Sequence, residues 1–279
     1  MSFKDYIKEN LPWIRSIYRK RLAPINLIHN IFDKPVVVLL YHRVNHLNRD
    51  LFNINVTPDN FERHIRILKN HYNVITFNDL KRNDIKEPSV IITFDDGYYD
   101  NYKYAFPILK KYQVPATIFI TSGGVDTGKE FWWDRLETVL FENKNLRESI
   151  ELDILNQRHI FDVSDDKKRL HSFYTLHHML FSLHPNERDM MLDRWYESYG
   201  LKVNPNNRTM TSSELIELYQ SQLVTLGAHT IHHPALKQIS REEQIQEIQS
   251  SKLFLENLLH TDIDIFAYPF GHKESFDQV

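Results

Sequence analysis

Carboxylate and imidazole side chains follow two apolar segments of this 279-residue chain. Asp95 and Asp96 come directly after the apolar run SVIITF, and His229 and His233 follow the apolar run LVTLG. One carboxylate and two imidazoles can hold a divalent metal and leave coordination positions open for water and substrate, which is typical of a catalytic site. The second carboxylate could then accept a proton from a metal-activated water.

Each of these patterns has an ordinary structural explanation when it stands alone. Adjacent Asp residues at a strand end often cap a helix, and 15 His residues produce His-x3-His spacings by chance. The combination is more specific, because both pairs follow apolar segments and the carboxyl ends of parallel strands meet at one edge of a sheet. We therefore predict a metal site formed by Asp96, His229 and His233.

Short apolar runs predict the strands that would bring these residues together. The expected strands are 36–41, 74–76, 89–94, 115–121, 223–227 and 263–268. Helical spacing and polar caps predict helices between them. The expected helices begin after Thr57, cover 100–112, extend from Thr211 to about 222 and cover 240–259. This alternation predicts an α/β fold with a mainly parallel sheet or barrel.

The alternation is interrupted over 131–210, where long helical patterns rich in His, Leu, Met and Tyr predict a helical insertion. We expect 35–279 to form one domain that contains this insertion, and 1–34 to form a separate amphipathic helical segment. Residues 1–32 contain six Lys and Arg residues but two acidic residues. This segment could pack on its own domain or lie on an anionic membrane surface.

Composition excludes several function classes. The net charge of -3 argues against a nucleic-acid partner, and the absence of Cys excludes disulfides, thiolate zinc sites and a cysteine nucleophile. Only 7 Gly residues occur, and no glycine-rich phosphate-binding string is present. Because no signal-peptide core or apolar stretch of ~18–20 residues is found, we expect a cytoplasmic protein, either free or peripheral at the inner membrane face.

The two segments of the predicted metal site resemble a known family. TFDDG at 93–97 and HTIHHP at 229–234 resemble the first and second motifs of the polysaccharide deacetylases, the NodB-homology enzymes of carbohydrate esterase family 4. The strings YHRV and FAYPFG resemble the same family, especially its branch that deacetylates poly-N-acetylglucosamine. The resemblance covers about 36–125 and 210–275 and leaves out the predicted insertion.

This resemblance implies a distorted (β/α)7 barrel that binds one divalent metal, usually zinc, and removes N-acetyl groups from a sugar or polysaccharide. Asp96, His229 and His233 match the metal ligands, and Asp95 matches the general base. Phe270 matches the position whose backbone N–H stabilises the oxyanion.

The sequence departs from the family pattern at two places. Ala267 stands where many members have an Arg that pairs with the general base. The last family motif supplies a His that protonates the leaving amine, and it would lie beyond Val279, as would the closing strand. We therefore expect a barrel truncated at its C-terminus; the alternative function is a catalytically impaired, carbohydrate-binding barrel.

Other residues near the motifs are candidates for contact with the substrate. His42 follows the first expected strand and Tyr268 lies within FAYPFG, so either could contact the substrate or the oxyanion. Trp132 and Trp133 follow the fourth expected strand and could stack on a sugar ring or pack inside the insertion. A non-haem iron oxygenase could use a similar ligand set, but the TFDDG context argues against it.

Overall fold

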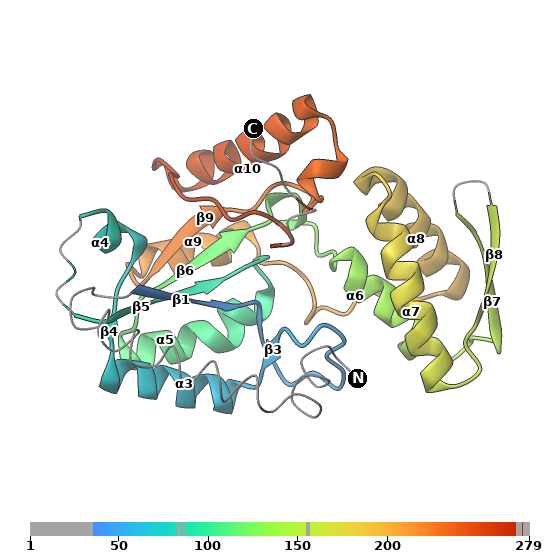
Figure 1. Cartoon of the computed structure of the whole chain (residues 1–279), viewed down its shortest axis with the longest axis horizontal. Coiled ribbons are helices and arrows are strands. Elements are labelled where there is room, and N and C mark those ends of the chain that lie inside the picture. Colours follow the sequence, from blue (N-terminus) through green and yellow to red (C-terminus); the bar gives the residue numbers. More distant parts are fainter. Residues whose placement is uncertain (1–35, 83–84, 86, 155–156, 272–274, 276–279) are drawn as a thin grey trace, which may run out of the picture.

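A parallel sheet of five strands forms the centre of the computed structural model, which describes residues 36–82, 85, 87–154, 157–271 and 275 (Figure 1). The strands are β1 (Val36–Tyr41), β4 (Asn73–Val74), β5 (Ser89–Phe94), β6 (Ala116–Ile120) and β9 (Val224–Ala228). Every pairing between them is parallel, so the predicted α/β class is confirmed. Within the described residues the sheet is open, because β1 pairs only with β5.

The middle strand, β5, is buried along its whole length. β1 pairs with all of it on one side. On the other side, β4 pairs with the first residues of β5, and β6 pairs with the last two, Thr93 and Phe94. Because β6 also pairs in parallel with β9, the carboxyl ends of β5, β6 and β9 lie at one edge of the sheet. Asp95 and His229 follow directly at that edge.

Helices pack on the sheet and supply much of its core. They are α3 (Pro58–His71), α4 (Phe77–Lys81), α5 (Phe106–Tyr112), α9 (Ser212–Gln220) and α10 (Arg241–Leu259). In the view of Figure 1, α3 and α5 lie below the sheet and α10 lies above it. A π-helical turn, Asn101–Ala105, precedes α5, so the helix predicted over 100–112 is present with an irregular first turn.

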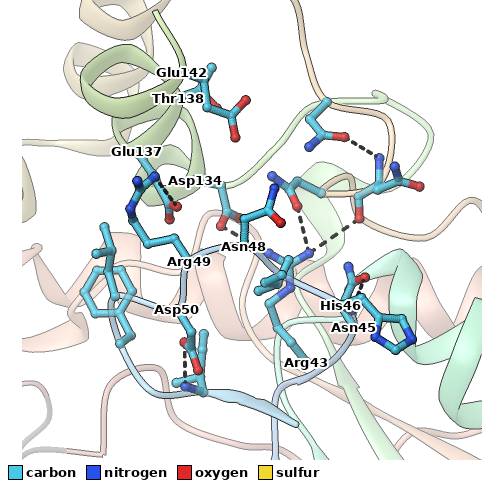
Figure 2. Close-up of a pocket in the computed structure, with 17 residues that line it drawn as sticks. Arg43, Asn45, His46, Asn48, Arg49, Asp50, Asp134, Glu137, Thr138 and Glu142 are labelled. Atoms are coloured by element: carbon cyan, nitrogen blue, oxygen red, sulfur yellow. Dashed lines mark hydrogen bonds and ion pairs between the residues drawn. The ribbon is translucent and has the colours of Figure 1, made fainter. Parts of the chain in front are cut away.

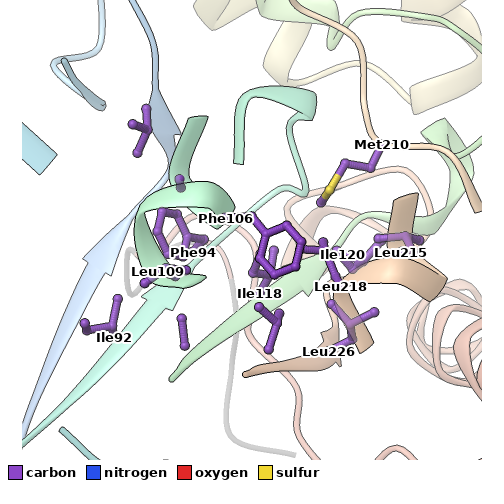
Figure 3. Close-up of a cluster of buried hydrophobic side chains, with 14 of the residues drawn as sticks. Ile92, Phe94, Phe106, Leu109, Ile118, Ile120, Met210, Leu215, Leu218 and Leu226 are labelled. Carbon is purple, nitrogen blue, oxygen red and sulfur yellow. The ribbon is translucent and has the colours of Figure 1, made fainter. Parts of the chain in front are cut away.

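Apolar side chains from the strands, α5 and α9 form the main core (Figure 3). Its fully buried members include Ile92, Phe94, Leu109, Ile118, Ile120, Leu215 and Leu218. Each side chain of this size contributes about 1.5–3 kcal/mol when it is removed from water. The core therefore holds the carboxyl edge of the sheet in a defined position.

Side-chain caps start three helices where the sequence predicts them. Thr57 accepts a hydrogen bond from the Asn60 N–H at the start of α3. Thr211 and Ser240 begin capping boxes at α9 and α10. These caps satisfy backbone N–H groups that have no partner inside the helix, at about 1 kcal/mol each.

Residues 131–210 form a second layer with its own hydrophobic cluster, visible at the right of Figure 1. Its elements are α6 (Trp132–Glu137), a π-helical turn (Thr138–Glu142), β7 (Ser149–Ile154), β8 (Gln157–Asp162), α7 (Asp166–Phe181) and α8 (Pro185–Tyr199). β7 and β8 pair as an antiparallel hairpin, which the sequence analysis missed. The alternation of polar and apolar residues in SIELDI is the signal that could have predicted it, and the structure buries the apolar ones.

The predicted strand over 263–268 is wrong. Only Phe266 forms a bridge, with Ala228, and the described residues extend this pairing no further. A short parallel pair, β2 (Arg43–Val44) with β3 (Asn55–Val56), was not predicted, because two residues are too few to show a periodicity. The predicted amphipathic segment 1–34 lies outside the described residues. None of the helices within those residues is long and apolar enough to cross a bilayer.

Candidate metal centre

The structure brings Asp96, His229 and His233 together at the carboxyl edge of the sheet. Their candidate ligand atoms all lie within 4.8 Å of one another. Asp96 Oδ1 is 3.5 Å from His229 Nε2 and 3.2 Å from His233 Nε2. All three residues are buried, so a cation at this position would be largely shielded from solvent.

Two consecutive residues with positive φ turn the chain at the end of β5. The φ angle is 75° at Asp96 and 81° at Gly97. Asp is among the few side chains that adopt this region readily, and Gly adopts it without a steric cost. The Gly97 N–H donates to the Asp95 carbonyl, and the Gly97 carbonyl accepts from the Met210 N–H. Hydrogen bonds therefore fix the turn both to the preceding residue Asp95 and to Met210 in a distant segment.

Gly97→Ala is expected to destabilise the protein by about 1–3 kcal/mol. The added Cβ would be held at a φ of +81° and would lie 3.1 Å from Ile120 Cδ1. Gly128→Ala is a matched control, because its φ is +68° and no atom lies within 4 Å of the added Cβ. Urea denaturation followed by circular dichroism measures both variants. Equal decreases in the free energy of unfolding for the two variants would show that the contact with Ile120 does not contribute to the destabilisation.

The loop between the two ligand histidines is strained and is held by hydrogen bonds. The φ angles of Thr230 and His233 are 66° and 52°, and a positive φ is a true outlier for a β-branched residue such as Thr. The Ser122 and Gly123 N–H groups donate to the carbonyls of Thr230 and Ile231, and the His233 N–H donates to Thr230 Oγ1. These bonds offset the strain and set the spacing of the two imidazoles.

Hydrogen bonds leave imidazole nitrogens available as ligands. His229 Nδ1 lies 2.9 Å from the Ala267 carbonyl, which can only accept, so Nδ1 carries the proton and Nε2 keeps its lone pair. Ala267 thus contributes a backbone atom where many family members carry Arg. His233 Nδ1 is buried with no hydrogen-bond partner among the described residues. Such an atom is uncommon. The other ring nitrogen, Nε2, faces Asp96 and is the one placed to bind an ion.

The pKa values of Asp96 and His233 favour metal-binding protonation states, whereas that of His229 favours the protonated imidazole until a cation binds. Burial alone would raise the pKa of Asp96, but hydrogen bonds to His229 and His233 outweigh it and hold that pKa below its usual range. Burial lowers the pKa of His233 by more than Asp96 raises it, so this imidazole is neutral at pH 7. Burial opposes protonation of His229 too, but Asp96 and Asp95 raise its pKa. A cation would repel that proton, so the donor set fits a divalent metal.

Asp95 lies beside these ligands. Burial raises the pKa of its carboxyl group, the charge of His229 opposes that rise, and the charge of Asp96 adds to it. His42 also acts electrostatically on both carboxylates, which places it at the same site. A carboxylate with a raised pKa is better suited to accept a proton near neutral pH than an ordinary Asp.

Glu247 is a residue of the site that the sequence analysis missed. Its carboxylate, on α10, accepts hydrogen bonds from the N–H groups of Ile231 and His232 at 2.7 and 2.9 Å, and from His232 Nδ1 at 2.7 Å. His232 is therefore tied to Glu247 and not to the ligand set. Glu247 shares the buried side of α10 with Leu255, so a Glu at a core position of this helix was the available signal.

Glu247→Gln is expected to weaken metal binding about 10–100-fold, the usual effect of removing a partner that orients the ligands. An amide cannot accept from all three donors, so the ligand loop loses part of its support. Competition with a chromophoric chelator measures the affinity. Glu242→Gln, at an exposed position of the same helix, is the matched control. Equal affinities for the two variants would show that Glu247 does not position the loop.

Phe270 and Tyr268 differ in their relation to the site. The Phe270 ring packs edge-on against His233, with centroids 4.5 Å apart, and the φ angle of Phe270 is 53°. Tyr268 is half exposed and its ring packs edge-on against Phe266. Phe270 thus contacts a ligand candidate, whereas Tyr268 lies near the surface.

Both tryptophans are buried, with exposed fractions of 3% for Trp132 and 5% for Trp133. Trp132 stacks on His177 at 4.6 Å. The Trp133 ring lies 5.1 Å from that of His233, and its Nε1 donates to the Tyr98 hydroxyl. The structure therefore favours the packing alternative, because neither ring offers a free face for a sugar. Trp133 instead packs against the ring of His233, one of the ligand candidates.

A buried ion network continues from Trp133. The Tyr98 hydroxyl donates to Asp134 Oδ2 at 2.8 Å. Arg43 Nε donates to Asp100 Oδ2 at 2.8 Å, its Nη1 lies 3.4 Å from Asp134 Oδ1, and its guanidinium covers the Tyr98 ring at 4.1 Å. Arg43 lies in YHRV and Tyr98 follows TFDDG, but only the folded chain shows that they meet.

This network borders a polar pocket of about 250 Å³ (Figure 2). Arg43, Arg49, Asp134 and Glu137 contribute to its walls. Burial raises the pKa of Asp134 to about 7 and that of Glu137 to about 7. None of the three metal-ligand candidates lines this pocket, so it is separate from the metal centre.

A family model of polysaccharide deacetylases matches residues 82–145 and 190–276. These segments cover more than half of the chain and contain Asp95, Asp96 and both candidate ligand histidines, His229 and His233. The residues between them, 146–189, include the β7–β8 hairpin and α7.

Curated relatives match shorter stretches. The chain is 42% identical over 96 residues to YxkH of Bacillus subtilis (strain 168), which is 32% of this chain and 33% of that protein. It is 36% identical over 110 residues to the poly-beta-1,6-N-acetyl-D-glucosamine N-deacetylase of Staphylococcus aureus (strain N315), which is 33% of this chain and 38% of that protein. The match thus spans about a third of each relative's length.

Solved structures share the fold. IcaB from Ammonifex degensii matches with a TM-score of 0.53 and 19% identity, over 87% of this chain and 78% of that one. A polysaccharide deacetylase from Bacillus cereus matches with a TM-score of 0.52 and 20% identity, over 85% and 51%. These likenesses establish the NodB-type α/β architecture. Together with the family match across both motif segments, they show that the chain belongs to the polysaccharide deacetylase family.

Proposed function

We propose that this protein is a metal-dependent hydrolase that removes N-acetyl groups from an N-acetylated sugar or polysaccharide. The observation that carries this proposal is the buried set of Asp96, His229 and His233, with Asp95 beside it. The name of the Staphylococcus aureus relative supports a polymer of N-acetylglucosamine as the substrate class.

In the proposed mechanism, Asp96, His229 and His233 hold one divalent ion, most simply zinc. Bound there, the ion supplies a Lewis acid that lowers the pKa of a water toward about 7 and polarises the amide carbonyl. Asp95 accepts the proton of the attacking water, and its raised pKa favours that transfer. The Phe270 backbone N–H donates to the oxygen on which negative charge develops.

Neighbouring residues position these groups. The Ala267 carbonyl orients His229, Glu247 holds the loop between the two histidines, and Phe270 and Trp133 pack on the His233 ring. His42 acts electrostatically on Asp95. It is our candidate either for the group that protonates the leaving amine as the amide C–N bond breaks or for a substrate contact.

Acetate release from a panel of N-acetylated sugars and polysaccharides tests the proposal. We expect release from an N-acetylglucosamine polymer, loss of that activity on dialysis against a chelator, and recovery when zinc is added. Activity that survives complete removal of metal would contradict the metal-dependent mechanism. Metal binding without acetate release from any member of the panel would contradict the hydrolase assignment.

We also infer from the sequence that residues 1–32 bind weakly to anionic membranes, which would place the protein at the inner face of a membrane. Their excess of Lys and Arg and the helical spacing of their apolar residues support this. Co-sedimentation with phosphatidylserine vesicles, compared with neutral phosphatidylcholine vesicles, measures the binding. The intact chain is expected to co-sediment with phosphatidylserine vesicles to a greater extent than a Δ1–32 variant. Equal partition of the two proteins would contradict this inference.

A further inference from the structure

Arg188, in the first turn of α8, is a largely buried cation whose Nε has no hydrogen-bond acceptor among the described residues. It is 3% exposed. The nearest carboxylate oxygen, Asp189 Oδ1, is 4.0 Å from Arg188 Nε, which is beyond hydrogen-bonding distance, and the Asp189 side chain is itself 43% exposed. The guanidinium lies 4.7 Å over the Trp132 ring. Arg188 thus has an aromatic neighbour, but its Nε has no acceptor among these residues.

A charge in this situation is strongly unfavourable unless something pairs with it. Burial lowers the pKa of Arg188 to about 10, and the charges of Asp189 and Glu247 act in the opposite direction, so the side chain remains protonated at pH 7. The aromatic contact offsets only part of the lost hydration, and an apolar side chain would pack on Trp132 without that loss. An anionic ligand explains the charge better than packing does.

Arg188 borders two pockets, one of about 120 Å³ toward Pro234 and Glu243 and one of about 80 Å³ beside the loop that joins His229 to His233. Only the smaller one also has Lys129 and Arg135 in its walls. We call it the Arg188 pocket, and its walls include Thr121, Gly124, Lys129, Trp132, Arg188 and His232. Thr121 and His232 come from the carboxyl edge of the sheet, and Trp132 comes from the insertion. The pocket therefore lies between the loop that joins His229 to His233 and the inserted helices. None of the three metal-ligand candidates lines it, so it is a neighbour of the metal centre and not part of it.

The charged groups on its walls favour an anion. Three cations, Lys129, Arg135 and Arg188, and two acidic residues, Glu130 and Asp189, line it. Lys129 and Arg135 are both ion-paired with Asp193, which is outside the pocket lining. The two carboxylate oxygens of Glu130 each accept a hydrogen bond from another side chain, and burial raises the pKa of this group. His232, also on the wall, is bonded to a carboxylate outside the pocket. Arg188 is the cation here whose Nε has no acceptor in the described part of the chain.

We propose that the Arg188 pocket is an oxyanion subsite beside the metal centre that binds a carboxylate or phosphate group. A planar guanidinium can donate two parallel hydrogen bonds to either group, and 80 Å³ holds a few heavy atoms but not a sugar ring. Two sources have this chemistry: acetate released by the reaction, and an acidic substituent on the polysaccharide. A role of this subsite in catalysis rests on the proposed function, whereas the binding of an anion to the Arg188 pocket does not.

Isothermal titration calorimetry of the full chain with inorganic phosphate and with acetate tests the binding. A metal ion can bind these anions itself, so titrations are made on metal-loaded protein and on protein dialysed free of metal. Arg188→Met keeps the packing on Trp132 and is expected to weaken anion binding about 10-fold or more in both forms. Arg188→Lys keeps the charge and is expected to weaken it less. Arg194→Met, exposed on the same helix, is the control and is expected to change nothing.

The proposal is overturned if wild type shows no saturable binding, or if a folded Arg188→Met variant binds both anions as tightly as wild type. If Arg188→Met fails to fold, Arg188→Lys decides, and unchanged affinity in that variant overturns the proposal. Anion binding that depends on Arg188 in a protein without deacetylase activity would leave the subsite standing while the proposed function fails.

Kinetics with two substrates distinguish the sources of the anion. The pair is a neutral N-acetylated oligosaccharide and one that carries a carboxylate on the neighbouring sugar. If Arg188→Met lowers kcat/KM only for the acidic substrate, the subsite binds a substituent of the polymer. If it leaves both values of kcat/KM unchanged but weakens inhibition by acetate, the subsite binds the released product.

Discussion

Asp96→Asn is expected to weaken metal binding by at least about 100-fold and to abolish acetate release with it. The change removes the one anionic ligand of the proposed centre and leaves a neutral amide among two buried imidazoles. Partners outside the ligand set already cost 10–100-fold in metal affinity when they are removed, so the loss of a ligand should exceed that range. Elemental analysis and chelator competition measure the effect.

Asp59→Asn, at an exposed position in the first turn of α3, is the control for this experiment. It should retain one equivalent of metal and full activity. If Asp96→Asn also retains one equivalent of metal at unchanged affinity, the ion binds elsewhere and the assignment of Asp96, His229 and His233 as ligands is wrong.

Asp95→Asn is expected to keep the metal and to lower kcat about 10²–10⁴-fold, the usual contribution of a positioned acid or base. The carboxylate is nearly isosteric with the amide, so the turn at the end of β5 should persist, but an amide cannot accept the proton of the attacking water. The raised pKa of Asp95, which follows first from burial, makes this residue the best-suited proton acceptor at the site. Acetate release and metal content are measured on the same preparation.

The combination of retained metal and lost activity is what separates Asp95 from Asp96. Activity of Asp95→Asn within a factor of about 10 of wild type would mean that another group accepts the proton. His42 would then be the first candidate, because it lies close enough to act electrostatically on both carboxylates. Loss of metal together with activity would instead assign Asp95 a ligand role.

The sequence by itself determined which residues could do chemistry and which segments would carry them. Asp95 and Asp96 follow a run of six residues that are all buried, and such a run predicts a central strand because every residue in it is apolar or small. His229 follows β9, whose largely buried run VTLG was predictable as a strand on the same grounds. The helix starts at Thr57, Thr211 and Ser240 were also predictable, because a cap depends only on residues within one turn.

Local sequence pattern did not decide whether every apolar segment would find a partner in the folded chain. The apolar run 263–268 resembles a strand, but a strand needs a neighbour along its length, and only Phe266 pairs within the described residues. Trp132 and Trp133 were equally suited to a sugar-binding surface and to a core. Their burial was decided by His177 and Tyr98, which other segments of the chain place against them.

Only the tertiary structure decided how the centre is supported. Glu247 lies in a helix whose sequence shows no functional motif, yet its carboxylate holds the histidine loop. Arg188 belongs to the insertion and reaches the Arg188 pocket only because folding places the start of α8 near Ile231 and His232. Catalytic residue types are visible in a sequence because their chemistry is carried by individual side chains. Hydrogen-bond support and unpaired buried charge are properties of pairs of residues, and folding alone brings such pairs together.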